Sequence, residues 1–180
     1  MSHEISTMEI GLSKNKIIKQ LFVSICFIGI GIWLLVKPPV ISNPYFGNPT
    51  VILCAGIASI ILFSIFAIMY IQKLRSSALG LIINKQGITD NSSALSVGLI
   101  AWSDIDNISV IEMYRQKLIM IEVNNPEEYI ARQPNSMKRK MMEMNYKTYH
   151  TPISITSNIL QIKYDDLLQK LTEDLEKSRS

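Results

Sequence analysis

Cysteine is almost absent from the chain, and the two that occur, Cys26 and Cys54, both lie inside long apolar stretches. Small domains that depend on disulfides carry more cysteines, at regular spacings. A structural disulfide framework is therefore excluded. In apolar surroundings a free cysteine serves as a small hydrophobic residue.

Histidine is equally scarce. His3 lies near the start of the chain and His150 follows a predicted helix, and neither has a cysteine, histidine or acidic partner at ligand spacing. A zinc site is therefore not expected. Asp104 and Asp106 are close in sequence, but no further oxygen ligands accompany them for calcium. The sequence predicts no metal site.

The motifs of common enzyme classes are also missing. The chain has no P-loop, no glycine fingerprint for dinucleotides and no nucleophile elbow. Asp104 could in principle act as an acid or base, but no second catalytic group lies near it in sequence. We therefore predict no catalytic residues, no cofactor and no enzymatic activity.

The chain does contain two long apolar runs near its start, Leu21–Val36 and Val51–Ile71. About 20 apolar residues are needed to cross a bilayer as a helix. The second run has that length, and the first reaches it when residues 17–20 are counted, with polar ends at the interface. We predict a transmembrane helical hairpin over residues 17–75, with spans at about 17–36 and 51–71 and an outer loop at 37–50.

Small residues in both runs favour close packing of the two helices. They are Gly29 and Gly31 in the first run, and Ala55 and Ser59 in the second. The first run could alternatively be a cleaved signal peptide, because basic residues precede it. No small-x-small cleavage pattern follows it, however, and a retained span is favoured.

Basic residues indicate the orientation of the hairpin. Three lysines precede the first run and Lys73 and Arg75 follow the second, whereas Lys37 is the only charge in the loop. Because basic residues stay on the cytoplasmic side, we expect both termini in the cytoplasm. Residues 76–180 carry 12 Lys/Arg against 13 Asp/Glu. A net-acidic domain argues against nucleic acid as a partner.

Residues 76–180 are predicted to form one small cytoplasmic domain. Residues 1–16 are polar and mixed and are expected to be a cytoplasmic tail, either frayed or forming a short interfacial helix, and no regular structure is assigned to them. Short alternating runs then predict seven strands, at residues 80–84, 88–90, 97–102, 108–115, 117–124, 153–156 and 159–163. A helical insertion at residues 125–150 interrupts the strands, and an amphipathic helix at 164–178 ends the domain.

Seven short strands followed by one helix resemble the pleckstrin-homology-like (PH-like) fold, a bent β-sheet or barrel with a C-terminal capping helix. Gly87–Asp90 and Gly98–Ile105 are similar to a Gly-Ile turn and a strand ending in Trp-x-Asp-Ile in bacterial PH-like membrane proteins. The whole chain resembles uncharacterised small bacterial membrane proteins with two transmembrane helices followed by a PH-like domain. The resemblance implies an α+β protein of the bacterial inner (plasma) membrane.

Three residues of this motif, Trp102, Asp104 and Ile105, are expected to be structural. Trp102 should anchor the core, with its indole N–H bonded to one partner. Asp104 should accept backbone N–H groups in the turn after the strand. Ile105 should return the chain to the core.

The helical insertion also carries a basic cluster beside a methionine stripe. The cluster is Lys138, Arg139, Lys140 and Lys147, and the stripe is Met137, Met141 and Met144. Such a helix can lie on an anionic membrane. Alternatively, the methionines pack on the domain and the basic side is merely solvated. The second interpretation is favoured, and Glu143 also dilutes the charge.

Together these features predict a non-enzymatic, membrane-anchored interaction or scaffold module. Its spans contact membrane lipids, and its PH-like domain binds a protein or peptide partner. The alternative function is a sensor of anionic lipid headgroups that acts through the basic cluster of the insertion.

Overall fold

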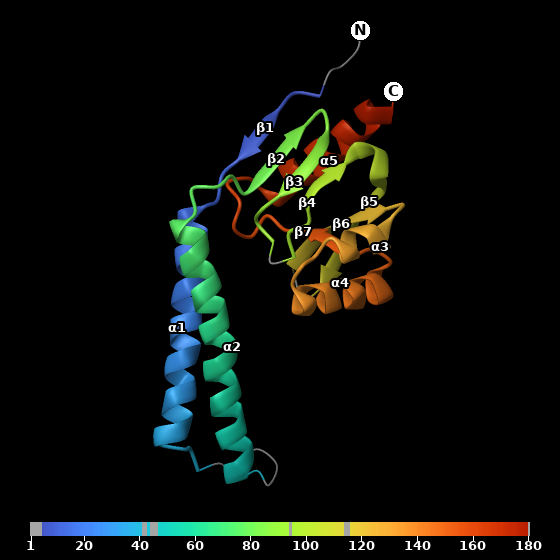
Figure 1. The fold of residues 1–180 in the computed structure, drawn as a ribbon. Coiled ribbons are helices and arrows are strands. Elements are labelled where there is room, and N and C mark those ends of the chain that lie inside the picture. The colour runs from blue at the N-terminus through green and yellow to red at the C-terminus, as the bar shows by residue number, and fades with distance from the viewer. Residues whose placement is uncertain (1–4, 41–42, 44–46, 94, 114–115, 180) are drawn as a thin grey trace. The chain divides into compact units, whose positions relative to one another are not determined.

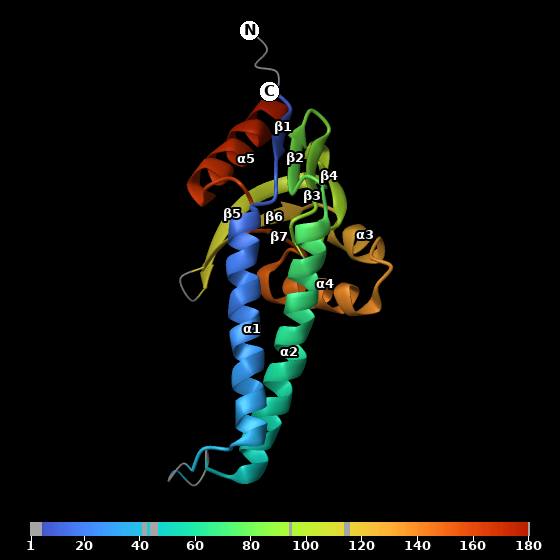
Figure 2. The ribbon, with the colours of Figure 1, turned by 90° about the vertical axis from the view of Figure 1, so that its left-hand side faces the viewer.

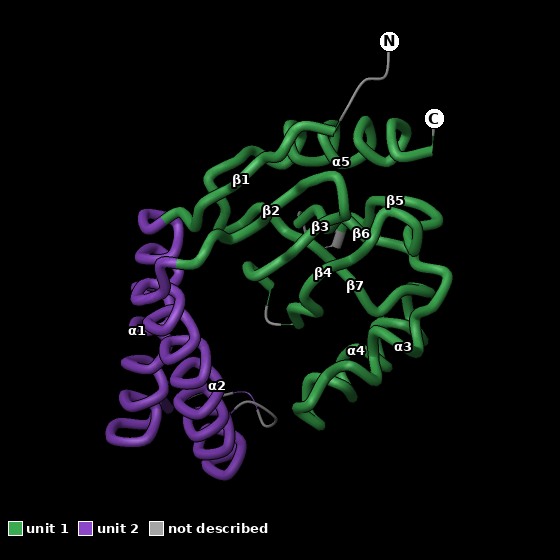
Figure 3. Tube along the Cα trace, turned by 45° about the horizontal axis from the view of Figure 1, so that its top comes forward, with its two compact units in different colours: residues 1–13, 78–180 green, residues 14–77 purple. Residues whose placement is uncertain are grey.

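The computed structural model describes residues 5–40, 43, 47–93, 95–113 and 116–179. The fold is α+β, with two long apolar helices and two antiparallel sheets (Figure 1). The chain divides into two compact units (Figure 3). Residues 14–77 form the helical unit, and residues 1–13 and 78–180 form what we call the sheet unit.

The helical unit consists of α1 (Lys14–Val36) and α2 (Pro49–Arg75). Proline in the first turn and the Asn48 side chain, which accepts a hydrogen bond from the Thr50 amide, mark the start of α2. Both helices are long and apolar enough to cross a membrane, and 17 % of the apolar window of each is buried. Residues 41–42 and 44–46 of the loop between them lie outside the described residues.

The two helices approach closely at small residues. A Cβ added to Gly31 would lie 2.9 Å from the Gly56 carbonyl oxygen, and one added to Gly56 would lie 3.1 Å from that of Gly31. The Ser59 hydroxyl donates to the Phe27 carbonyl at 3.0 Å. Close packing is therefore confirmed at Gly31 and Ser59. Gly29 is not part of this contact, because a Cβ there would meet nothing within 4 Å.

The first sheet has the strand order β1-β2-β3-β4. These strands are Met8–Ile10, Leu81–Asn84, Gly87–Asp90 and Gly98–Ala101. The sequence predicts no regular structure for residues 1–16, but Met8–Ile10 form an edge strand that pairs Met8 with Ile83 and Ile10 with Leu81. The physical reason is burial, because Ile10 and Leu81 both enter the core. α1 also begins within the predicted tail, at Lys14.

The second sheet has the order β5-β6-β7, with β5 at Ile105–Met113, β6 at Gln116–Val123 and β7 at Ile153–Ile155. Antiparallel pairing of β5 with β6 confirms the predicted hairpin, although residue 115, its predicted strand end, lies outside the described residues. The strand expected at 159–163 does not form. Leu160 makes an isolated bridge with Leu12 instead.

Three helices and one short turn complete the sheet unit. They are η1 (Trp102–Asp104), α3 (Pro126–Ala131), α4 (Ser136–Tyr149) and α5 (Tyr164–Arg179). Asn135 caps α4, because its side chain accepts from the amides of Met137 and Lys138. In two views at right angles, α5 lies away from α3 and α4 (Figures 1 and 2).

One apolar core joins both sheets and α5. Leu167, Leu171 and Leu175 are buried, which confirms the predicted apolar stripe of the last helix. The strands contribute a set of fully buried aliphatic side chains: Leu81, Ile83, Ile88, Ile100, Ile119, Ile121 and Ile155. η1 follows β4, and the core therefore fixes the positions of η1 and of the start of β5.

Candidate functional site

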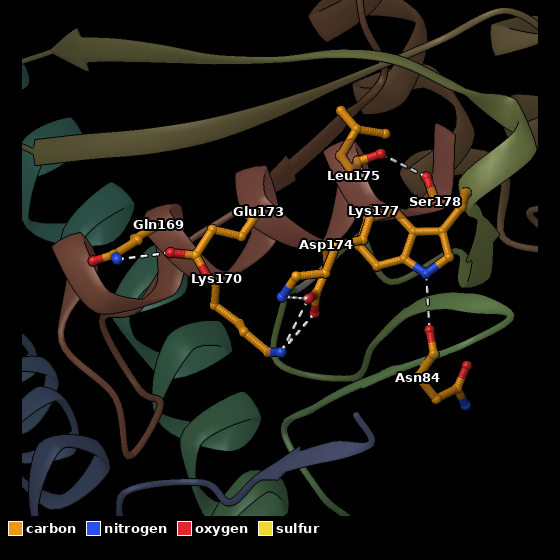
Figure 4. A network of polar contacts seen from close by, with 9 residues as sticks. Asn84, Gln169, Lys170, Glu173, Asp174, Leu175, Lys177 and Ser178 are labelled. Carbon is orange, nitrogen blue, oxygen red and sulfur yellow. Dashed lines mark hydrogen bonds and ion pairs between the residues drawn. The ribbon is translucent and has the colours of Figure 1, made fainter. Parts of the chain in front are cut away.

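Trp102 holds the corner between the two sheets. Its ring is buried in the core, and its indole Nε1 donates to the Asn84 carbonyl oxygen at 2.8 Å (Figure 4). The backbone amide of Trp102 donates to the Gln86 carbonyl. Ile105 follows and is also buried. Trp102 and Ile105 are thus buried as predicted, and the indole has Asn84 as its one partner.

Asp104 differs from its prediction. Its carboxylate accepts hydrogen bonds from three side chains, the Tyr129 hydroxyl at 2.7 Å, Ser103 at 3.1 Å and Asn125 at 3.4 Å. No bond from a backbone N–H group is described for this side chain, so the expected turn role is wrong. The reason is that α3, inside the insertion, places Tyr129 and Asn125 against the corner. Local sequence does not reveal this distant pairing.

The Asp104–Tyr129 pair has shifted pKa values. The hydrogen bond from Tyr129 is the main cause that lowers the pKa of Asp104. Burial, and next the hydrogen bond to Asp104, raise the pKa of Tyr129 to about 12. The phenol therefore stays neutral and donates to a carboxylate at neutral pH. Tyr129 is fully buried, and its bond to Asp104 ties η1 to α3.

The free energy of unfolding of the parent protein should fall at alkaline pH because Tyr129 ionises. We expect Tyr129→Phe to abolish this contribution. An unfolded tyrosine ionises near pH 10, whereas the folded phenol ionises near 12. The stability that Tyr129 contributes is therefore complete below pH 10 and is lost as the pH rises to 12, by roughly 2–3 kcal/mol.

Denaturant unfolding of the full chain in detergent micelles would measure this change. Trp102 fluorescence in a Trp33→Phe background reports on the corner. The difference in unfolding free energy between the parent and Tyr129→Phe should shrink between pH 9 and pH 12. Equal pH slopes for both proteins would contradict the assigned role of the Asp104–Tyr129 bond.

A second acidic side chain, Asp174 on α5, is fully buried but paired. Lys170 Nζ lies 3.0 Å from its Oδ1 and 2.9 Å from its Oδ2, and Lys177 Nζ lies 3.5 Å from Oδ1 (Figure 4). Both lysines are partly buried beside it. A buried charge needs such partners. Both lysines lie on α5 itself, so Asp174 is explained by ion pairs within this helix.

The methionine stripe of α4 does not pack on the sheet unit. Met137, Met141 and Met144 are 71 %, 42 % and 62 % exposed, whereas Met142 is fully buried. The favoured interpretation of the sequence, in which the stripe is core, is therefore wrong. Met142, Tyr146 and Tyr149 recur at the same helical spacing, and this second stripe carries the buried and half-buried side chains. Tyrosine in the second stripe is the signal that could have favoured it.

The basic cluster of α4 divides into two parts. Arg139 donates to the Gln133 carbonyl from both Nη2, at 2.8 Å, and Nε, at 3.3 Å. Lys138, Lys140 and Lys147 are exposed. At about 3.6 residues per turn, Lys140 and Lys147 flank the methionine stripe on one side, and Lys138 flanks it on the other.

We call the exposed surface of this helix the α4 face. It consists of Met137, Met141 and Met144 with Lys138, Lys140 and Lys147. An exposed apolar stripe between lysines is typical of a binding surface rather than of a solvated helix side. It is therefore the candidate functional site of the sheet unit.

Metal chemistry finds no support in the part of the chain that the structure describes. There, no group of three or more His, Cys, Asp and Glu side chains could hold a metal ion.

Comparison of the chain with protein-family models, with curated proteins and with solved structures finds no match to any of them.

Proposed function

We propose that the chain is a two-span membrane protein whose sheet unit is a non-enzymatic interaction or scaffold module in the cytoplasm. The exposure of α1 and α2 carries this proposal. Phe22 on α1 and Ile61 and Ile68 on α2 are 66 %, 57 % and 56 % exposed. An apolar surface that follows two helices of membrane-spanning length is unfavourable in water and suits hydrocarbon.

The charge pattern supports an orientation with both termini in the cytoplasm. Lys14, Lys16 and Lys19 lie in the first two turns of α1, and Lys73 and Arg75 lie in the last turn of α2. These ends are adjacent in a hairpin, and the positive-inside rule places them in the cytoplasm. A bacterial inner (plasma) membrane is the location that the resemblance of the sequence implies.

A PH-like arrangement of the sheet unit is part of the proposal. Two antiparallel sheets share one core, and the C-terminal helix α5 buries its apolar stripe in that core. The resemblance to PH-like barrels implies a surface that holds a peptide, a protein or a lipid headgroup. In this chain the hairpin is inserted between β1 and β2, which are hydrogen-bonded neighbours. The short connections, residues 11–13 and 76–80, therefore attach the module to the spans at two points.

Cell fractionation and cysteine labelling test this proposal. We expect the full chain to stay in the membrane pellet after alkaline carbonate washing, because two apolar helices in hydrocarbon do not exchange into water. Detergent should release it. Recovery of the chain in the aqueous fraction without detergent would overturn the proposed anchoring.

Orientation needs a separate measurement. In a background with Cys26→Ala and Cys54→Ala, a membrane-impermeant thiol reagent on intact cells should label Val40→Cys in the loop. It should label Thr172→Cys on α5 only after permeabilisation. Both sites are exposed in the structure, so burial does not explain a difference. The opposite labelling pattern would refute the cytoplasmic location and leave the anchoring intact.

A further inference from the structure

We propose that the α4 face is a second, peripheral membrane contact, which lies on an anionic bilayer surface. The methionines would enter the boundary between headgroups and acyl chains, and the lysines would bind lipid phosphates. This inference rests on the proposed membrane anchoring, and it names the partner of the interaction module.

Exposed methionines supply the apolar half of this contact. Three large apolar side chains on one side of a 14-residue helix remain in water in the isolated chain. The opposite side of α4 is anchored in the sheet unit through Met142. α4 therefore presents a fixed apolar stripe, and unbranched methionine side chains adapt to an irregular surface such as a lipid headgroup layer.

The distribution of charge favours an anionic surface as the occupant. α4 carries four basic residues and one acid, whereas the other residues of 76–180 carry eight basic residues and twelve acids. An anionic bilayer therefore attracts the α4 face and repels the remainder of the sheet unit. The same asymmetry disfavours docking by any other part of the unit.

Tethering favours a membrane over a free acidic partner. Residues 11–13 and 76–80 connect the sheet unit to both helices of the proposed hairpin. Short connections give lipid headgroups a high effective concentration at the sheet unit, so weak contacts suffice for docking. Each basic residue near an anionic surface favours binding about fivefold. Three lysines then favour the docked state about 125-fold.

A depth measurement on the full chain tests the proposal. The chain, with Cys26→Ala and Cys54→Ala, would be reconstituted in lipid nanodiscs with a spin label at Thr148→Cys, beside the methionine stripe. Relaxation by oxygen and by a water-soluble nickel chelate reports the depth of the label. In nanodiscs that contain phosphatidylglycerol, the label should lie in the bilayer interface. In pure phosphatidylcholine it should lie mainly in water.

A label at Thr172→Cys on α5 is the matched control. Thr148 and Thr172 are both exposed, and each hydroxyl donates to the carbonyl four residues earlier, in Met144 and Leu168. The two substitutions therefore disturb the fold equally. The Thr172→Cys label should remain in water in both lipids. If it inserts as Thr148→Cys does, the contact does not belong to the α4 face.

Charge variants distinguish the effect of the lysines of the α4 face on docking from the effect of the overall charge of the chain. Lys140→Gln with Lys147→Gln should lower the ratio of docked to free states about 25-fold in anionic nanodiscs. Lys85→Gln with Lys163→Gln removes the same charge elsewhere and should have little effect. Arg139 is unsuitable for this test, because its bonds to Gln133 support the start of α4.

Three further results would overturn the inference. First, the Thr148→Cys label could stay in water on anionic lipid. Second, the ratio of docked to free states could fall equally in both charge variants. Third, the Thr148→Cys label could be shielded from the nickel chelate equally in both lipids. The last result indicates a protein contact, such as a second copy of the chain. If the chain instead fails to enter nanodiscs, the anchoring itself is wrong. Failure of the inference and failure of the proposed function are thus distinguishable.

Discussion

Trp102→Ala is expected to lower the free energy of unfolding of the sheet unit by about 4 kcal/mol. The indole is the largest side chain at the corner, and it is buried among core residues from both sheets. Its removal leaves a cavity and also leaves the Asn84 carbonyl oxygen without its indole donor. Few single substitutions destabilise a small domain to this extent.

Trp102→Phe is the matched control for the hydrogen bond. It retains most of the aromatic volume but cannot donate to Asn84. We expect a loss of about 2 kcal/mol, from the unpaired carbonyl and the smaller ring. Hydrogen exchange of the amides of β2, β3 and β4, measured by mass spectrometry on the full chain in detergent, reports both values. Equal exchange in Trp102→Ala and the parent would show that the corner does not depend on Trp102.

Local signals predicted much of the fold. The long apolar runs gave α1 and α2, because length and composition alone distinguish them. The β5–β6 hairpin and the stripe of α5 followed from residues that are near in sequence. β1 has only a weak local signal, the alternation of Met8, Ile10 and Leu12. Its three residues become a strand because they pair with β2, which lies 70 residues later in the chain. Another distant contact, the isolated bridge between Leu12 and Leu160, is found where a strand was expected at 159–163.

Prediction of the candidate site from the sequence was also limited by contacts between residues that are distant in the chain. Periodicity placed methionines and lysines on one helix, but it could not show which of two stripes faces the core. That choice depends on Tyr129, Met142 and the sheet residues around them, which meet only in the folded chain. Asp104 is a similar case, because its partners come from α3 and not from the adjacent turn. Sequence therefore identified the helix that carries the site and assigned its surface incorrectly.

Insertion of the hairpin between β1 and β2 relates the fold to the proposed function. β1 is held by its pairing with β2 and by burial of Ile10. Loss of the first sheet would therefore release one of the two connections to the spans. The proposed docking of the α4 face is favoured by both connections, since they keep the sheet unit near lipid. Without the first sheet, only the covalent connection at residues 76–80 would tether the unit.

Gly87→Ala should prevent this sheet from forming. Gly87 begins β3 with φ +155°, and a Cβ there would lie 2.0 Å from the Ile100 carbonyl oxygen and 2.8 Å from its carbon. Backbone atoms of a neighbouring strand cannot move aside without loss of the Ile88–Ile100 pair, whose side chains are fully buried. We expect a destabilisation of more than about 4 kcal/mol, which exceeds the range of most single substitutions.

Gly98→Ala separates the clash from the backbone conformation. Gly98 begins β4 with φ +77°, and a Cβ there would meet nothing within 4 Å. Its substitution should therefore cost only the strain of a left-handed residue, about 1–2 kcal/mol. Thermal unfolding followed by hydrogen exchange should show a folded first sheet in Gly98→Ala and none in Gly87→Ala. If both variants lose the same stability, backbone strain alone explains the glycine at position 87, and the close approach of β4 does not restrict it.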